Sequence, residues 1–157
     1  MAKVKKIGTG KIRKIQGGKE PLRLVEDFMI RRGFDPAESV QQRTSDIAAW
    51  SVPLNEEEEL EISLEGLSRP PETTLYMGVN IFQVPLINCS NVMAAALSVA
   101  DTLIGAKISL VNYDLVLSIT RYTANMSASE VDYMYELLTV QKPSVIEAIN
   151  DELRSMS

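Results

Sequence analysis

The sequence predicts an α+β domain in which helices pack mainly on one face of an antiparallel sheet of about five strands. Two segments, Glu57 to Glu65 and Thr73 to Val84, alternate apolar and polar residues as half-buried strands do. The connections between neighbouring strand segments are short, which favours antiparallel pairing. Helix-like segments precede, interrupt and follow the strands, so the expected order is α-β-β-β-α-β-β-α.

The first expected helix runs from Glu20 to Arg32, and Gly33 follows it as a stop signal. Its apolar residues recur on one face, as in an amphipathic helix. A second, short helix is expected from Asp35 to about Gln42, because Asp35-Pro36 has the form of an N-cap followed by a first-turn proline. The core-facing residues of the first helix are Leu22, Val25, Phe28 and Met29.

Three strands are expected next, beginning with Ile47 to Leu54. Pro53 has no amide hydrogen to donate, so we place this strand at a sheet edge. In the two strands that follow, apolar residues alternate with polar ones, which assigns them to the core face. These inward residues are Leu60, Ile62, Leu64, Leu75, Met77, Val79 and Ile81, while Tyr76 and Phe82 are expected on the opposite face.

An apolar helix is expected from Val92 to Ile104, with only a narrow polar stripe, so we predict that it is buried on more than one side. Two strands, Ala106 to Val111 and Leu115 to Thr123, follow as a hairpin joined by Asn112-Tyr113-Asp114. The last helix opens on the capping box Ser127-Ala128-Ser129-Glu130. Because proline disrupts a helix interior, we expect a break at Pro143 and a restart through about Leu153.

The composition predicts one domain, residues 20–157, preceded by a basic arm. A length of 157 residues and a hydrophobic share of 45% suit a single folded domain. The chain has no histidine, the commonest general base and metal ligand, so we expect no enzyme, no metal and no cofactor. A single cysteine and no recognisable signal peptide favour a reducing compartment, the cytoplasm, and no apolar segment is long enough to span a membrane.

The arm, residues 1–19, holds seven basic residues and no acidic one, so the formal net charge of −5 combines a basic arm with a strongly acidic body. Glycines and like charges argue against a stable helix, which leaves a flexible arm or an arm that binds nucleic acid or a partner. The arm has no aromatic residue for base stacking, and the acidic body repels a polyanion, so we expect weak nucleic-acid binding. We expect the arm to rest loosely on the acidic row Glu57, Glu59, Glu61 and Glu65, either of its own chain or of a partner subunit.

Glutamates between Glu56 and Glu65 have a second interpretation, as a site for a divalent cation, since hard cations prefer carboxylates. Ligands on one strand face, however, stand in a row and lack a loop that wraps the ion. We therefore interpret them as a solvated face that opposes edge-to-edge association. Cys89 lies near a helix N-terminus, where a thiolate is favoured, but without a histidine base we interpret it as a buried structural cysteine.

The order of elements resembles the type III secretion chaperone-like fold and, within it, the YbjN-type family of bacterial sensory transduction regulators. The resemblance covers roughly Leu22 to Gln141. It rests on the meander from Glu59-Leu60-Glu61-Ile62-Ser63-Leu64 to Thr74-Leu75-Tyr76-Met77-Gly78-Val79, the helix Val92 to Ile104, the hairpin around Asn112 and the helix from Ser127. Secretion chaperones of this fold are small, acidic, homodimeric and non-enzymatic, so the resemblance implies a protein-binding dimer. The basic arm departs from that pattern.

Two functions follow from these observations. The first is a non-enzymatic protein-binding or regulatory module that acts as a homodimer, because the helix Val92 to Ile104 is too apolar to have one exposed side. The expected interface residues are Val92, Met93, Ala96, Leu97 and Ala100. The alternative is a nucleic-acid-associated protein that uses the cations of its arm, Lys3, Lys5, Lys6, Lys11, Arg13 and Lys14.

Overall fold

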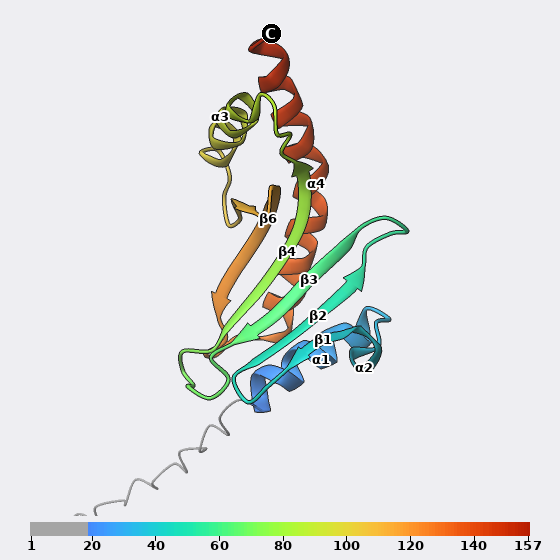
Figure 1. Ribbon diagram of the computed structural model, residues 1–157. Helices are drawn as coiled ribbons and strands as arrows, with labels where there is room; N and C mark the ends of the chain where they lie inside the picture. Colours follow the sequence, from blue (N-terminus) through green and yellow to red (C-terminus); the bar gives the residue numbers. More distant parts are fainter. Residues whose placement is uncertain (1–18) are drawn as a thin grey trace, which may run out of the picture.

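A computed structural model describes residues 19–157, and the predicted basic arm, apart from Lys19, lies outside the described residues. The fold is α+β, as expected, with a six-stranded antiparallel sheet in the order β1-β2-β3-β4-β6-β5 (Figure 1). The elements are α1 (Lys19–Arg31), α2 (Pro36–Ser39), β1 (Val40–Arg43), β2 (Ile47–Pro53), β3 (Glu59–Glu65), β4 (Thr74–Gln83), α3 (Cys89–Ala100), β5 (Lys107–Val111), β6 (Asp114–Tyr122) and α4 (Ala128–Ser155).

The core lies between one face of the sheet, called here the inner face, and the helices. Alternate residues of β3 and β4 are buried on this face as predicted, and the long helix α4 lies along it. Helix α1 adds Val25, Phe28 and Met29, all fully buried. The largest buried side chains of the core are Trp50, Phe28, Met29, Leu60, Ile62, Leu64, Leu75, Met77, Leu115, Leu117, Met134 and Leu138.

The prediction that β2 is an edge strand is wrong, because β1, which the sequence analysis missed, lies beside it. Asp35 does cap α2, accepting a hydrogen bond from the Ala37 amide at 2.8 Å, but α2 has only four residues and buries none of them. The predicted helix therefore ends at Ser39, and the next residues pair with β2 instead. That pairing reaches only Trp50, so Pro53 lies where β2 has a neighbour on one side only.

A β-bulge between Asn80 and Phe82 corrects a second expectation. The bulge shifts the register of β4 against β6, so that Phe82 pairs with Leu115. Phe82 therefore packs partly buried against the core, and not on the opposite face. Tyr76, which precedes the bulge, keeps its predicted outward position and is half-buried.

Helix α4 begins with the predicted capping box, in which Ser127 and Glu130 satisfy each other's amides. The predicted break at Pro143 is wrong, since α4 continues without interruption from Ala128 to Ser155. Proline removes one helical hydrogen bond, but the buried residues Leu138, Val145 and Ile149 lie on one face on both sides of it and keep the helix in place. The C-terminal half of α4 extends beyond the sheet, with α3 beside it (Figure 1).

Helix α3 ends at Ala100, before the predicted Ile104, and residues 101–103 continue as turns. The β5–β6 hairpin was predicted correctly, but its loop is only Asn112-Tyr113, since Val111 pairs with Asp114. Both loop residues have positive φ, 49° and 68°, which is the type I′ conformation that suits a two-residue hairpin.

Ionic contacts fix α1 against α4. Arg31 donates to Asp132 at 3.0 Å, and Arg32 pairs with both Asp132 at 3.3 Å and Glu136 at 2.9 Å. The Arg32 guanidinium also lies 4.7 Å from the centre of the Tyr135 ring, within reach of a cation–π interaction. These contacts raise the pKa of Arg32, with the hydrogen bond to Glu136 as the largest cause.

Candidate protein-binding surface

Exposed apolar side chains gather along the chain segment between β4 and the β5–β6 turn, and we call this set the α3–β5 surface. Its members come from the loop before α3, from α3 itself, from the connection after α3 and from β5. Their exposed fractions range from 47% at Val111 to 85% at Leu86. The members are Leu86, Ile87, Leu97, Ile104, Leu110, Val111 and Tyr113.

Two contacts connect parts of the α3–β5 surface. The Val84 amide donates to the Tyr113 carbonyl at 2.7 Å, which joins the start of the β4–α3 loop to the β5–β6 turn. Helix α3 also contacts β5. In Figure 1, α3 and β6, the partner of β5, lie on one side of α4, and α1 and α2 lie on the other. An apolar surface gathered in this way is typical of a protein interface.

The structure divides the five expected interface residues between two sides of α3. Val92 and Ala96 are only 5% and 3% exposed and pack in the core of their own chain. Met93 and Ala100 are half-buried, and Leu97 is 68% exposed. Since residues four and seven positions apart share a side of a helix, Met93, Leu97 and Ala100 form one flank, in which Met93 packs partly against the core and Leu97 is exposed.

Helix α3 begins at Cys89, three residues before the predicted start at Val92. Asn88 stands at the N-cap in the left-handed conformation, with φ 61°, and its side chain makes no capping hydrogen bond. Cys89, interpreted as buried from the sequence, is exposed. Cys89 is the only cysteine of the chain and lies two positions after Ile87, so a thiol reagent can label the protein close to the α3–β5 surface.

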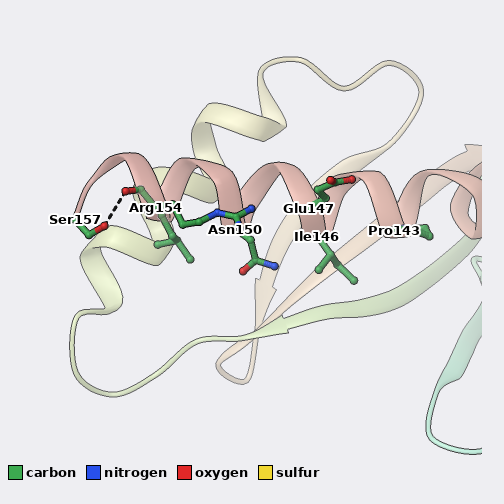
Figure 2. Close-up of a pocket in the computed structure, with 7 residues that line it drawn as sticks. Pro143, Ile146, Glu147, Asn150, Arg154 and Ser157 are labelled. Carbon is green, nitrogen blue, oxygen red and sulfur yellow. Dashed lines mark hydrogen bonds between the residues drawn. The ribbon is translucent and has the colours of Figure 1, made fainter.

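A shallow hollow of about 680 Å³ lies on the C-terminal half of α4 (Figure 2). All of its lining residues belong to α4 except Ser157, which follows the end of the helix, so it is one side of a helix and not a crevice between two elements. Ser157 donates from its hydroxyl to the Arg154 carbonyl at 2.7 Å and closes the helix end. The lining residues are Pro143, Ile146, Glu147, Asn150, Leu153, Arg154 and Ser157.

A smaller crevice of about 340 Å³ separates the β2–β3 turn from α4. At its wall, the ammonium of Lys142, whose side chain is 9% exposed, pairs with the Glu58 carboxylate at 2.5 Å. This hydrogen bond is the largest cause that lowers the pKa of Glu58, and a second from Asn55 lowers it further. The ion pair connects the β2–β3 turn to α4, and the charge of each side chain is compensated by the other. The other lining residues are Leu54, Tyr135, Thr139, Pro143 and Ile146.

The outer face of the sheet carries the acidic row that the sequence predicted. Glu57, Glu59, Glu61 and Glu65 are all exposed, and Glu59 accepts a hydrogen bond from the Ser51 hydroxyl at 2.7 Å. Within residues 19–157, no group of three or more metal-ligating side chains gathers into a possible ion site. Among the helices that the structure describes, none is long and apolar enough to cross a membrane.

Comparisons with known proteins establish the fold of the chain and nothing finer. The sequence matches no family model and no curated protein. The structure resembles a chain of the crystal structure of the ExsC–ExsE complex, with a TM-score of 0.61, 10% identity, and coverage of 83% of this chain and 93% of that one. It also resembles a chain of the HopA1–SchA chaperone–effector complex, with a TM-score of 0.55, 12% identity, and coverage of 83% and 95%. The chain therefore has the type III secretion chaperone-like fold.

Helix α3, on which the sequence predicted an interface, contributes Leu97 to the α3–β5 surface, but most of the other exposed apolar residues of that surface were not predicted. Leu86, Ile87 and Ile104 lie in connections, and periodicity says nothing about the exposure of loop residues. Leu110 and Val111 are adjacent on β5 and both exposed, so strand alternation did not mark them. The available signal was an excess of apolar residues next to turn residues between Pro85 and Tyr113.

Proposed function

We propose that this protein is a non-enzymatic protein-binding module that forms a homodimer through its α3–β5 surface. The observation that carries the proposal is the exposure of large apolar side chains, among them Leu97, Ile104 and Leu110, in the segment from Leu86 to Tyr113. Single exposed apolar residues are ordinary, but seven of them between positions 86 and 113 are a concentration that is typical of a protein interface.

The comparisons support protein binding. One similar structure is a chaperone–effector complex, and the other is a complex of two named proteins. Both belong to proteins with about a tenth of their residues in common with this chain, so they supply the fold and a precedent for a protein partner. A YbjN-type regulatory role and a cytoplasmic location remain parts of the proposal, which rest on the sequence resemblance and on the single cysteine.

A two-fold contact suits the geometry of the flank formed by Met93, Leu97 and Ala100. In such a contact the same patch faces its own copy, and helix α3 crosses the partner's α3. Ala100 is small and permits close approach of the two helices, while Leu97 supplies the apolar side chain at the centre. Ile104 and Leu110, both exposed, would extend the contact toward the area that a stable dimer buries, roughly 1,200–2,000 Å² in total.

Light scattering of the intact chain tests the proposal. We expect the mass of a dimer at high micromolar concentration, falling to that of the 17.4 kDa monomer on dilution if association is reversible. A monomer throughout the concentration range would contradict a homodimer. The exposed Cys89 gives an independent reading, because a thiol reagent should label it more slowly in the dimer than in the dilute monomer.

A further inference from the structure

The outer face of the sheet carries negative charge that the described part of the chain does not balance. Glu59, Glu61 and Glu65 project from β3, and Glu57 projects from the turn before it. Among the side chains described, none of these four glutamates forms an ion pair. The Lys142 ammonium is taken by Glu58, which points to α4.

The cations of the body are used elsewhere. Seven of them are paired with acids of α1, α4 or the turns, and only Lys107 and Arg121 form no ion pair among the side chains described from residue 20 onward. Lys107 and Arg121 lie on β5 and β6, across the sheet from β3. The paired cations are Arg23, Arg31, Arg32, Arg43, Arg69, Lys142 and Arg154.

Tyr76 lies beside the acidic row on the outer face. Its ring lies over Gly78, where a Cβ would stand only 2.2 Å from the phenol oxygen, so a larger residue there would displace the ring. Gly78 pairs with Glu61 on one side and with Ser118 on the other. Ser118 is 1% exposed, and its hydroxyl lies next to the Tyr76 phenol, to which it is a hydrogen-bonding neighbour. Burial and the nearby Glu61 raise the pKa of Tyr76.

The chain itself contains a segment with the matching charge. Residues 1–18 hold six cations, no acid, and the apolar residues Val4, Ile7, Ile12 and Ile15 between them. We infer that residues 1–18 dock on the outer face of the same protomer, along the row from Glu65 to Glu57, with their cations against the glutamates and their apolar residues against Tyr76.

The point at which this segment joins the body fits the inference. Segment 1–18 is followed directly by α1, and Glu26 of α1 pairs with Arg43 of β1 at 3.1 Å. Arg43 stands opposite Ala48, and Ala48 stands opposite Leu64, so this part of α1 lies at the Glu65 end of β3. An extended chain of 18 residues spans up to about 60 Å, whereas the row from Glu65 to Glu59 is only about 20 Å long.

Docking of this kind would cover the outer face of the sheet, on which none of the helices within residues 19–157 packs in the way that α4 packs on the inner face. A protein that binds the outer face must then displace residues 1–18 or carry positive charge of its own. The α3–β5 surface would stay free, because it lies at the opposite edge of the sheet from β1 and β2. The inference does not depend on the proposed homodimer.

Paramagnetic relaxation in the full-length chain tests the inference. A nitroxide is attached at Thr9→Cys in a Cys89→Ser background, and amide relaxation is measured across residues 19–157. We expect enhancement over Glu59–Glu65 and around Tyr76. The variant Glu59→Gln, Glu61→Gln, Glu65→Gln should weaken docking about eightfold, since each exposed ion pair changes an equilibrium by about twofold. Added salt should weaken it as well.

The matched control neutralises three other exposed acids, Glu38→Gln, Asp101→Asn and Glu147→Gln, and should leave the enhancement unchanged. Enhancement over another surface, or enhancement that survives the β3 substitutions, would overturn the inference. Loss of the signal when the labelled chain is diluted with unlabelled chain would place the contact between molecules and overturn it too. Tight binding of a random-sequence DNA duplex at physiological salt, abolished by deletion of residues 1–18, would assign the segment to nucleic acid instead.

Discussion

The inner face of the sheet and the α3–β5 surface contain the same types of apolar side chain, but the first is buried and the second is exposed to solvent. Leu60, Leu64 and Leu75 on the inner face are fully buried, whereas Leu86, Leu97 and Leu110 on the α3–β5 surface are exposed by half or more. The first set is covered by helices of its own chain, and the second is covered by nothing among residues 19–157. The difference teaches that apolar side chains of the same kind form both the core and an exposed surface, and our proposal is that a second protein covers the exposed one.

The largest expected effect comes from the same substitution made in both regions. Leu60→Ala removes a fully buried side chain and should lower the free energy of unfolding by about 2–5 kcal/mol. Leu97→Ala removes a side chain that is 68% exposed and should change it by only about 0–0.5 kcal/mol in dilute protein. Urea denaturation measures both. Equal losses at the two positions would break the distinction between the regions.

Helix α4 links the two regions, and Pro143 tests whether packing alone holds it straight. Pro143→Ala restores an amide that can donate to the Thr139 carbonyl, so we expect stabilisation. The gain should be about 1 kcal/mol, below the roughly 3 kcal/mol between proline and alanine in a regular helix, because the unfolded chain also gains freedom. Thermal or urea unfolding measures it, with the neighbouring Ser144→Ala as control. Destabilisation would mean that α4 requires a proline bend at this position.

The smallest expected effect comes from the Lys142–Glu58 pair at the turn of β2 and β3. The pair lowers the pKa of Glu58, so its stabilisation is present above the ordinary glutamate pKa and is lost as pH falls through the lowered one. Glu58 is 42% exposed, so Lys142→Met should cost only about 0–1 kcal/mol at neutral pH. The loss should vanish in acid. A difference between variant and parent that is the same at acidic and neutral pH would contradict this role.

Much of this arrangement was predictable from the sequence where a pattern had only one solution. The alternation in β3 correctly indicated which residues are buried and which glutamates are exposed. The turn residues Asn112-Tyr113-Asp114 correctly indicated the β5–β6 hairpin. Strand β1 was not predictable, because Val40-Gln-Gln-Arg has no alternation and all four residues are exposed. The break at Pro143 was predicted wrongly, because a helix tolerates an internal proline when tertiary contacts hold it in place. Those contacts join α4 to residues distant in the sequence, which local patterns do not show.

The candidate site was predictable only in part. An apolar helix such as α3 offers aliphatic residues on every side, so its sequence does not say which flank faces the core. Val92 and Leu97 look alike in the sequence, yet one is buried and the other exposed. Which of the two residues is buried depends on the position of α4 and of the loops around α3, and local periodicity gives no information about either.

The most direct test of the account places a charge on the exposed flank of α3. Leu97→Asp should leave the circular dichroism spectrum and the unfolding transition of the monomer nearly unchanged, because the side chain is 68% exposed in the single chain. It should abolish the dimer seen by light scattering, because an unpaired charge buried at an interface is strongly unfavourable. Val140→Asp, at an equally exposed apolar residue on the solvent side of α4, is the matched control and should remain dimeric. A dimer that survives Leu97→Asp, or one that Val140→Asp disrupts equally, would contradict the assignment of the α3–β5 surface.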